Sequence, residues 1–267
     1  MKGNKKTMTS FITETFMLHN ETAKSLYQNY AKDMPIYDYH CHLDPKQISD
    51  NRHFDNITEL WLGGDHYKWR AMRAQGINEY YITGDAHPRE KFRKWAQTLE
   101  NAVANPLYHW SHLELAMYFN VHEVLNEANA DRIYDEVNQY LKENHVTTQT
   151  LITQSNVRLI CTTDNPTDDL AYHDEIKAQT KFKTTVLPAF RPDVAFKIGE
   201  KAFVTFIDTL SALTQPIRDV STFIDALEQR IVYFHSKGGR LADHGLNTLE
   251  YQPYTEQEIQ DIFKKVK

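Results

Sequence analysis

The spacing of apolar residues divides the chain into a long helical stretch and a later part in which strands alternate with helices. Between residues 44 and 155 the apolar positions recur every three or four residues, which is the period of an amphipathic helix. Two sets of residues carry this spacing: Phe92, Trp95, Ala96, Leu99 and Val103, and Ile133, Val137, Tyr140 and Leu141. No run in this stretch has the character of a strand, so the pattern predicts a mostly helical insertion or cap over residues 44–155.

Ahead of the insertion the pattern predicts one helix and one strand. The helix covers residues 21–33 and places four residues on one face: Ala23, Leu26, Tyr27 and Tyr30. Pro35 ends it, because proline disfavours the helical conformation of the residue before it. The aromatic-rich run 36–42 that follows is typical of a strand. We therefore assign residues 9–43 to an N-terminal helix and a first strand.

After residue 155 the pattern changes to alternating strands and helices. β-rich runs over residues 157–161, 184–190 and 240–245 each end in polar residues. Two amphipathic helices are marked by Phe203, Phe206, Ile207 and Leu210 and by Phe223, Leu227, Ile231 and Phe234. Gly238-Gly239 is placed to end the second helix, since glycine favours the position just after a helix. This alternation predicts a parallel sheet, whose functional residues collect at the carboxyl ends of its strands.

The number of strands leaves two architectures open. About four strands are predicted, whereas a closed (β/α)8 barrel needs eight. Residues 256–267 have the pattern of one more helix. The periodicity is compatible with an open parallel sheet and with part of a barrel, and it does not choose between them.

Composition places the chain among globular proteins and excludes several other classes. The hydrophobic fraction is 41% and the charged fraction 25%. A formal net charge of -6 argues against a nucleic-acid-binding protein, which usually carries a basic surface. No apolar run is long enough to span a membrane, and only two cysteines occur, as expected in a reducing cytoplasm. Residues 1–8 are basic without an apolar segment after them, so we expect a disordered leader and a cytoplasmic protein.

The sharpest local signal is His40-Cys41-His42 at the end of the first predicted strand. In a strand, residues i and i+2 share a face, so both imidazoles can reach one metal ion while Cys41 points the other way. The same alternation predicts that Tyr37 and Tyr39 lie on an apolar face packed against helices. Zinc suits imidazole ligands, and manganese or iron would also fit. The alternative is that the two histidines only fill space and form hydrogen bonds.

Two further segments place charged side chains where a ligand can be held. Residues 63–70 contain a histidine, a tyrosine and two cations, and they either contact a ligand or form a solvated face around a core Trp69. Arg191 follows the run 184–190 and either clamps a carboxylate with two N–H groups or pairs with Asp193 at the surface.

Two other polar segments have ordinary structural explanations. Asp243-His244 at a strand end is either a further ligand or acid, or a histidine with a structural role. Residues 162–166 are typical of a helix N-cap and turn. No Gly-x-Gly-x-x-Gly, P-loop or Gly-x-Ser-x-Gly motif occurs in the sequence, so nucleotide binding and serine-hydrolase chemistry have no support.

Taken together, these segments resemble the uronate isomerase family of the amidohydrolase superfamily. The matching segments, in the family's order, are Asp38–Leu43, Gly64–Arg73, Asn105–Glu114, Cys161–Pro166, Phe190–Asp193 and Ala242–Leu246. The resemblance runs from about Thr9 to the end of the chain. Its motifs are weak singly and specific jointly.

The resemblance implies a fold, an activity and a set of site residues. The fold is a distorted (β/α)8 TIM-type barrel of the metal-dependent hydrolase type, with a helical insertion after the first strand. The activity is aldose–ketose isomerisation of hexuronates, from D-glucuronate to D-fructuronate and from D-galacturonate to D-tagaturonate. His40 and His42 resemble the family's metal ligands, for a divalent ion that we expect to be zinc. His66 and Tyr67 resemble its substrate-contacting catalytic pair, and Arg191 resembles the arginine that holds the sugar acid.

The resemblance also shows where this chain departs from the family. The family chain is longer, and its last barrel strand supplies an Asp followed by an Arg that no segment here matches. We therefore expect an N-terminal part of such an enzyme, with truncated βα units over residues 156–267, reduced activity and exposed apolar surface that favours association. The expected partner is a small hexuronate, with no nucleic acid and no membrane, and a homo-oligomer is possible. The alternatives are another amidohydrolase-type enzyme that uses metal-bound hydroxide, or a non-catalytic fragment that binds sugar acids.

Overall fold

The computed structural model describes residues 10–246 and 251–266, and it divides into two compact units. The helical unit comprises Met1–Met34 and Arg52–Gln154, and the sheet unit comprises Pro35–Asn51 and Ser155–Lys267. The leader predicted over residues 1–8 lies outside the described residues. The N-terminal helix groups with the helical unit, and residues 44–51 at the start of the predicted insertion group with the sheet unit.

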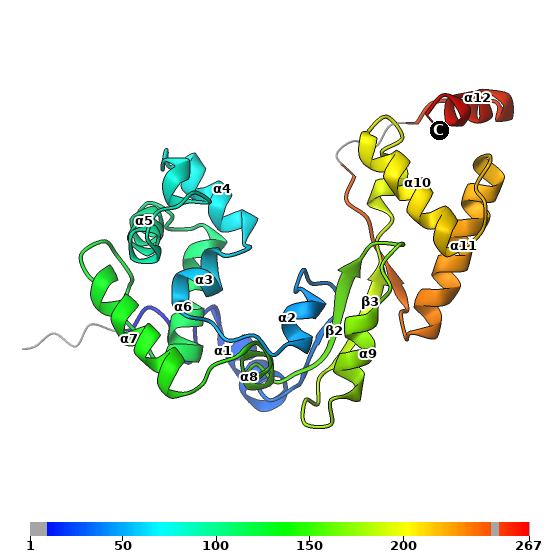
Figure 1. Ribbon diagram of the computed structural model, residues 1–267. Coiled ribbons are helices and arrows are strands. Elements are labelled where there is room, and N and C mark those ends of the chain that lie inside the picture. The colour runs from blue at the N-terminus through cyan, green and yellow to red at the C-terminus, as the bar shows by residue number, and fades with distance from the viewer. Residues whose placement is uncertain (1–9, 247–250, 267) are drawn as a thin grey trace, which may run out of the picture. The chain divides into compact units, whose positions relative to one another are not determined.

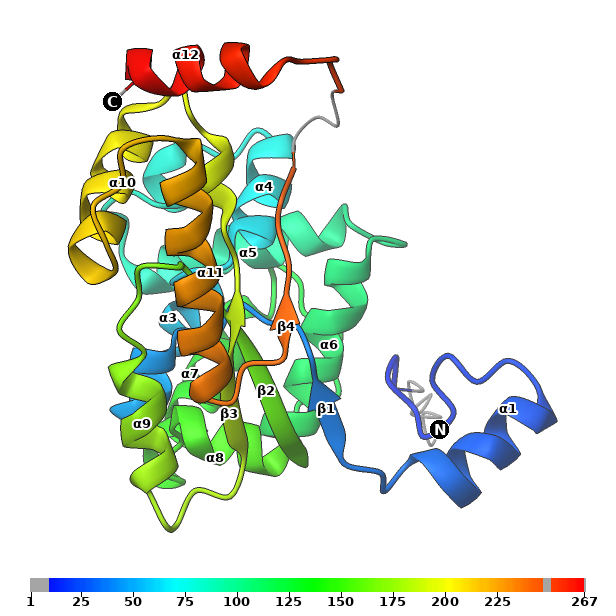
Figure 2. The same ribbon diagram turned by 90° about the vertical axis from the view of Figure 1, so that its right-hand side faces the viewer.

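The sheet unit is built on four parallel strands in the order β1-β2-β3-β4. The strands are β1 (Ile36–Asp38), β2 (Val157–Asp164), β3 (Thr185–Phe190) and β4 (Leu241–Ala242). Figure 2 shows the four strands pointing in one direction in a curled sheet. The β2–β3 ladder is the longest, and it places Asp164 beside Phe190 at its carboxyl end. The predicted parallel sheet is therefore confirmed, and the described residues contain half the number of strands of a closed (β/α)8 barrel.

Helices connect these strands as the pattern of the sequence predicts. The helices of the sheet unit are α2 (Pro45–Ser49), α9 (Ala171–Ala178), the 3-10 helix η3 (Asp193–Phe196), α10 (Lys201–Leu213), α11 (Val220–Ser236) and α12 (Glu256–Val266). α9 joins β2 to β3, and α10 and α11 join β3 to β4 (Figure 1). The Ser49 hydroxyl donates to Glu175 (2.7 Å) and the Gln179 amide donates to the Ser49 carbonyl (2.8 Å). These contacts hold α2 against α9 and explain why it belongs to the sheet unit.

The end of α11 shows how local sequence and packing agree. Gly238 follows the C-cap residue Lys237 and has φ +103°, a conformation that residues with a Cβ rarely adopt. A Cβ at this position would lie 2.9 Å from Cδ2 of Leu187. The glycine predicted to end the helix is thus required by its backbone angle, whereas the Leu187 side chain could move to admit a Cβ.

Arg230 ties the middle of α11 to the loop that follows β2. This residue is buried, and its Nε donates to the Pro166 carbonyl (2.6 Å) while Nη2 donates to the Asp168 carbonyl (2.7 Å). The guanidinium also lies over the ring of Tyr233, 4.1 Å from the centroid. Burial lowers the pKa of the guanidinium, and the two carbonyls compensate for part of the lost hydration.

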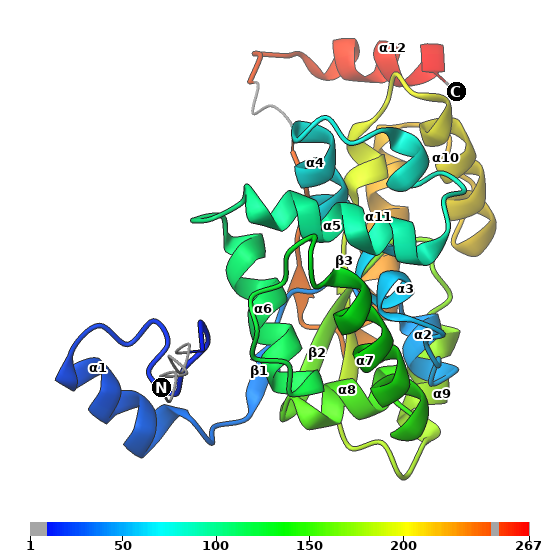
Figure 3. The same ribbon diagram turned by 90° about the vertical axis from the view of Figure 1, so that its left-hand side faces the viewer.

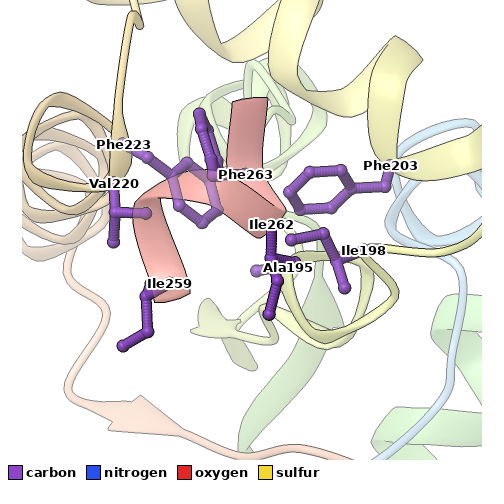
Figure 4. Close-up of a pocket in the computed structure, with 8 residues that line it drawn as sticks. All are labelled: Ala195, Ile198, Phe203, Val220, Phe223, Ile259, Ile262 and Phe263. Atoms are coloured by element: carbon purple, nitrogen blue, oxygen red, sulfur yellow. The ribbon is translucent and has the colours of Figure 1, made fainter. Parts of the chain in front are cut away.

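An apolar core of the sheet unit lies where α10, α11 and α12 meet. Phe203, Phe223 and Phe263 pack edge-on or tilted, and Phe263 is buried. A pocket of about 170 Å³ opens at this junction (Figure 4) and is lined only by apolar residues: Ala195, Ile198, Phe203, Val220, Phe223, Ile259, Ile262 and Phe263. Its lining offers no acid, base or metal ligand, so the pocket has no chemistry of its own.

The elements of the helical unit are α1 (Glu21–Leu26), the π-helix η1 (Tyr27–Ala31), α3 (Ile57–Leu62), α4 (His66–Ala74), the 3-10 helix η2 (Glu79–Tyr81), α5 (Pro88–Glu100), α6 (Pro106–Phe119), α7 (Ala130–Glu143) and α8 (Thr148–Gln154). Helices α3 to α8 pack around one core (Figure 3), to which α1 and η1 contribute no buried residue. Asn56, Asp65 and Asn105 accept backbone hydrogen bonds as N-caps, which fixes the starts of three of them. Proline occupies the first turn of α5 and α6, where its missing N–H costs nothing.

The predicted helical faces of the insertion are largely confirmed. Phe92, Trp95, Ala96 and Leu99 on α5 are buried, as are Ile133, Val137 and Leu141 on α7. Val103 is 70% exposed, contrary to the prediction, because α5 already ends at Glu100.

The predicted apolar face of the N-terminal helix is wrong. α1 has only six residues and continues into the five-residue π-helix η1, and neither contains a buried residue. Leu26 and Tyr30 are 57% and 68% exposed. A π-helical turn contains more residues than an α-helical turn, so residues with α-helical spacing no longer share one face. No helix within the described ranges is long and apolar enough to cross a membrane.

Candidate active site

The carboxyl ends of β1, β3 and β4 bring four polar residues together in the sheet unit. These residues are His40, His42, Arg191 and Asp243. Backbone hydrogen bonds continue the sheet past the strand ends: Cys41 N–H donates to Cys161, Arg191 N–H to Asp164, and Asp243 N–H to Phe190. The predicted grouping of functional residues at this edge is therefore realised for His40, His42 and Arg191.

The two histidines lie close together, although not for the predicted reason. β1 ends at Asp38, and its pairing with β2 is irregular between Ile36 and Tyr37, so His40 and His42 follow the strand. Their ring centroids are 5.0 Å apart with the ring planes perpendicular. Proximity comes from the bend after the strand.

The predicted packing of the opposite face of this strand is wrong. Tyr37 and Tyr39 are 57% and 74% exposed. β1 lies at one end of the strand order and pairs with β2 alone. Cys41 is half-buried, and burial raises the pKa of its thiol to about 11.

The histidine pair suits a metal ion in part. Nδ1 of His42 lies 3.2 Å from the Thr163 hydroxyl, and Nδ1 of His40 lies 3.5 Å from Asp243 Oδ2. Oxygen neighbours at Nδ1 orient an imidazole so that Nε2 is the atom that binds a metal. Within residues 10–246 and 251–266, however, no group of three or more His, Cys, Asp or Glu side chains converges on one point. Two imidazoles are one fewer than the three protein ligands of a typical catalytic zinc site.

Arg191 is held by carboxylates on both sides of its Nε atom. Nε donates to Asp193 Oδ2 (2.9 Å) and lies 3.7 Å from Asp243 Oδ2. Asp193 in turn accepts from the Gly245 backbone N–H (2.9 Å). Gly245 packs so closely that a Cβ there would lie 2.9 Å from Arg191 Nη2. The predicted Arg191–Asp193 pair therefore forms, but as part of a larger cluster and not as an isolated surface pair.

Asp243 is a functional candidate that the sequence suggested only weakly. It faces both His40 and Arg191, and Oδ1 is buried without a hydrogen-bond partner among the described residues. The available signal was its position directly after a short β-rich run. The adjacent His244 instead packs edge-on against Phe196, with 5.8 Å between ring centroids, as a structural histidine would.

A second polar cluster lies buried at the end of β2. The Thr162 hydroxyl donates to Asp164 Oδ2 (2.7 Å) and lies 2.8 Å from His173 Nε2. Burial raises the pKa of Asp164 to about 6 and lowers the pKa of His173 to about 4. The turn predicted over residues 162–166 forms only at Asn165, which accepts from Thr167. Thr162 and Asp164 lie within the strand, where sequence reasoning did not expect a buried network.

His66 and Tyr67 lie in the first turn of α4, in the helical unit. Their ring centroids are 4.3 Å apart, and Tyr67 is 54% exposed. Asp65 caps the helix by accepting from the Tyr67 and Lys68 N–H groups. The structure thus brings His66 and Tyr67 together in one unit, and His40, His42 and Arg191 in the other.

Lys68 does not belong to a solvated face, which was one of the two possibilities predicted for residues 63–70. It is buried, its Nζ donates to Asp65 Oδ2 (2.8 Å), and Nζ also lies over the Trp61 ring. Burial raises the pKa of the Glu114 carboxyl, and the positive charge of Lys68 partly offsets this rise. The Lys68–Asp65 ion pair lies at the start of α4, next to His66.

Sequence comparison relates the chain to uronate isomerases. A family model described as glucuronate isomerase matches residues 8–267. The uronate isomerase of Staphylococcus haemolyticus is 67% identical over 256 residues, which cover 96% of this chain and 55% of that protein. The uronate isomerase of Bacillus subtilis is 49% identical over 257 residues, covering 96% and 54%. The chain therefore spans about half the length of the curated relatives it matches.

Two solved structures share the fold. The crystal structure of uronate isomerase from Thermotoga maritima matches with a TM-score of 0.89 at 31% identity, covering 97% of this chain and 56% of that one. Glucuronate isomerase from Caulobacter crescentus matches with a TM-score of 0.82 at 24% identity, covering 91% and 52%. Together with the curled parallel sheet, these likenesses confirm the predicted α/β barrel architecture, of which the described residues provide four strands.

Proposed function

The chain belongs to the glucuronate isomerase family, and from this membership we propose that the whole protein interconverts aldohexuronates and ketohexuronates. The substrates we propose are D-glucuronate, converted to D-fructuronate, and D-galacturonate, converted to D-tagaturonate. The single observation that carries the proposal is the match of the family model over residues 8–267. The cluster of His40, His42 and Arg191 at one edge of the sheet supports it, because two imidazoles and a guanidinium suit a sugar acid bound next to a metal.

The reaction sets the chemistry that the site must supply. An aldose–ketose isomerisation moves a proton between C1 and C2 through an enediolate, so negative charge develops on the carbonyl or hydroxyl oxygen. A divalent metal on His40 and His42, which we propose to be zinc, would polarise that oxygen as a Lewis acid. Within the described ranges no third His, Cys, Asp or Glu side chain converges with these two, whereas a catalytic zinc typically has three protein ligands.

Arg191 is proposed to hold the C6 carboxylate of the substrate. A guanidinium presents two parallel N–H groups to a carboxylate, a geometry that lysine cannot offer. Asp193 binds the Nε atom, so the guanidinium has a fixed orientation before substrate arrives. A side chain that is oriented in advance loses less entropy on binding.

His66 and Tyr67 are proposed to assist proton transfer and to contact the sugar. Their rings lie next to each other in a tilted arrangement at the start of α4, and the exposed Tyr67 phenol can exchange hydrogen bonds with a hydroxyl group. A positioned acid or base typically contributes 10²–10⁴-fold to a rate. We give this pair a supporting role and leave the main base to a residue outside the described set.

The proposal is tested by following C1 and C2 of glucuronate in ²H₂O by NMR. Isomerisation through an enediolate should produce fructuronate that carries deuterium at C1, because the transferred proton exchanges with solvent. The assay is repeated after chelation and after adding back zinc or manganese, with D-glucose as the neutral control. Deuterated ketose only from uronates, and only with metal, is the expected result. Binding without turnover would instead support a sugar-acid-binding protein, and hydrolysis of an added amide or ester would support a hydrolase.

We also propose that the protein works in the cytoplasm. Cys41 and Cys161 are both free cysteines in the structure. Free thiols persist in a reducing compartment, where disulfides are rare. Fractionation of cells followed by immunodetection tests this assignment, and detection outside the cytoplasm would contradict it.

A further inference from the structure

We propose that Asp243 is a positioning residue that fixes the orientation of both Arg191 and His40. The inference rests on the proposed function, since it assigns a role relative to the carboxylate anchor and the metal ligand of that site. Asp243 Oδ2 lies 3.7 Å from Arg191 Nε and 3.5 Å from His40 Nδ1. One carboxylate therefore faces two side chains that reach the site from different strands.

The register of the sheet places Asp243 there by construction. Phe190 of β3 pairs with Ala242 of β4, so the next residue of each strand, Arg191 and Asp243, are neighbours at the carboxyl edge. The Asp243 N–H donates to the Phe190 carbonyl (3.1 Å), which holds its backbone in place. A carboxylate on a fixed backbone can orient the longer and more flexible arginine beside it.

The burial of Asp243 separates it from an ordinary surface acid. Its side chain is 28% exposed, yet Oδ1 is buried and has no hydrogen-bond partner among the described residues. A buried carboxylate oxygen that lacks a partner is costly, and most such oxygens in proteins are paired. The position is therefore poorly explained by stability alone, and well explained by a requirement for negative charge next to Arg191 and His40.

Asp243 acts on each neighbour in a different way. For Arg191, Asp243 adds a second carboxylate near Nε beside Asp193, and the two negative charges favour the orientation in which Nε faces them. For His40, a carboxylate at Nδ1 orients the ring and favours the tautomer whose Nε2 is free to bind a metal. Loss of such an outer partner typically lowers metal affinity or activity 10- to 100-fold.

The test is a set of variants of the whole protein in which charge is removed with little change of shape. Asp243→Asn is compared with Asp174→Asn, a matched control in the sheet unit whose carboxylate pairs with Lys237 away from the site. The dissociation constant for zinc is measured by chelator competition, and KM for glucuronate is measured at saturating zinc. We expect Asp243→Asn to weaken zinc binding about 10- to 100-fold and to raise KM about 10-fold, with a melting temperature like that of the control.

A double-mutant cycle shows whether Asp243 acts through Arg191. In the Arg191→Met background, Asp243→Asn should raise KM no further, because the side chain that it orients is gone. Additive effects on KM, or unchanged zinc affinity and KM in Asp243→Asn, would overturn the proposal. If the unmodified protein does not turn over glucuronate at all, the proposed function fails, and the zinc measurement still tests the contact with His40.

Discussion

Replacing Asp164 with Asn should uncover a titration that is hidden in the wild-type protein. Asp164 and His173 are both buried and share the Thr162 hydroxyl. The hydroxyl donates to the carboxylate, so its oxygen accepts from Nε2–H of a neutral imidazole. Asn at position 164 keeps an oxygen for Thr162 and removes only the ionisable group.

The two groups oppose each other as pH changes. The pKa of Asp164 is raised to about 6, so between about pH 4 and 6 its carboxyl is protonated in the folded state and ionised in the unfolded state. Proton binding therefore stabilises the folded state at low pH, and this contribution is lost as pH rises through about 6. The pKa of His173 is lowered to about 4, so its contribution is fully present above about pH 6.5 and is lost as pH falls through about 4. Each pKa shift of about two units corresponds to about 3 kcal/mol of unfolding free energy, and the two contributions have opposite signs.

The stability of the wild-type protein should therefore depend little on these two groups between pH 4 and 6.5. Removing either group should expose the pH dependence that the other group causes. Asp164→Asn should lose about 3 kcal/mol more than wild type on acidification from pH 6.5 to 4. His173→Gln should show the reverse, with stability falling as pH rises from 4 to 6.

The assay must follow the sheet unit by itself. All four tryptophans, at positions 61, 69, 95 and 110, lie in the helical unit, so their fluorescence reports on the other part of the chain. Amide hydrogen exchange of peptides from β2 and β3 reports the opening free energy of the sheet at each pH. Exchange free energies of Asp164→Asn, His173→Gln and wild type that stay parallel from pH 4 to 6.5 would show that the two groups do not oppose each other.

Three further predictions concern the candidate site and the fold that carries it. His40→Ala or His42→Ala should lower the bound metal measured by elemental analysis. Cys41→Ser should leave the metal content nearly unchanged, because the protonated thiol is a poor ligand. Equal metal content in all three variants would contradict the assignment of His40 and His42 as metal ligands. Arg191→Met should weaken uronate affinity about 10- to 150-fold and Arg191→Lys less, since a charge-assisted hydrogen bond contributes about 1.5–3 kcal/mol, and unchanged affinity would leave only a structural pair. Arg230→Met should cost about 2–4 kcal/mol in urea unfolding because two loop carbonyls lose their donor, and a loss below about 1 kcal/mol would show that water replaces it.

Local pattern predicted several secondary-structure elements of this protein, although it did not predict α9 and it made β1 and β4 too long. The β2 and β3 strands, the helices α10 and α11, and the glycine that ends α11 are all where the sequence predicts them. These features depend on side-chain period and backbone preference, which a short stretch of sequence contains in full. The wrong burial predictions concern side chains that no neighbouring element covers, such as Tyr39 after β1 and Tyr30 in the π-helix.

The candidate site was determined by sequence only as a set of separate motifs. His40-Cys41-His42 and Arg191 were identifiable because metal and carboxylate binding require those residue types. Their proximity was expected from the rule that parallel strands end at one edge, and the structure agrees for the sheet unit. The sequence did not show that a bend, and not strand alternation, places the two imidazoles together.

Only the tertiary structure decided which charges face each other. The contact of Asp243 with Arg191 depends on the pairing of Phe190 with Ala242, and these two residues are more than fifty positions apart. The network of Thr162, Asp164 and His173 likewise depends on how α9 packs on the sheet. Charge–charge distances and burial arise from register and packing between distant segments, and pKa values follow from both. A linear pattern contains neither quantity, so the two clusters became visible only in three dimensions.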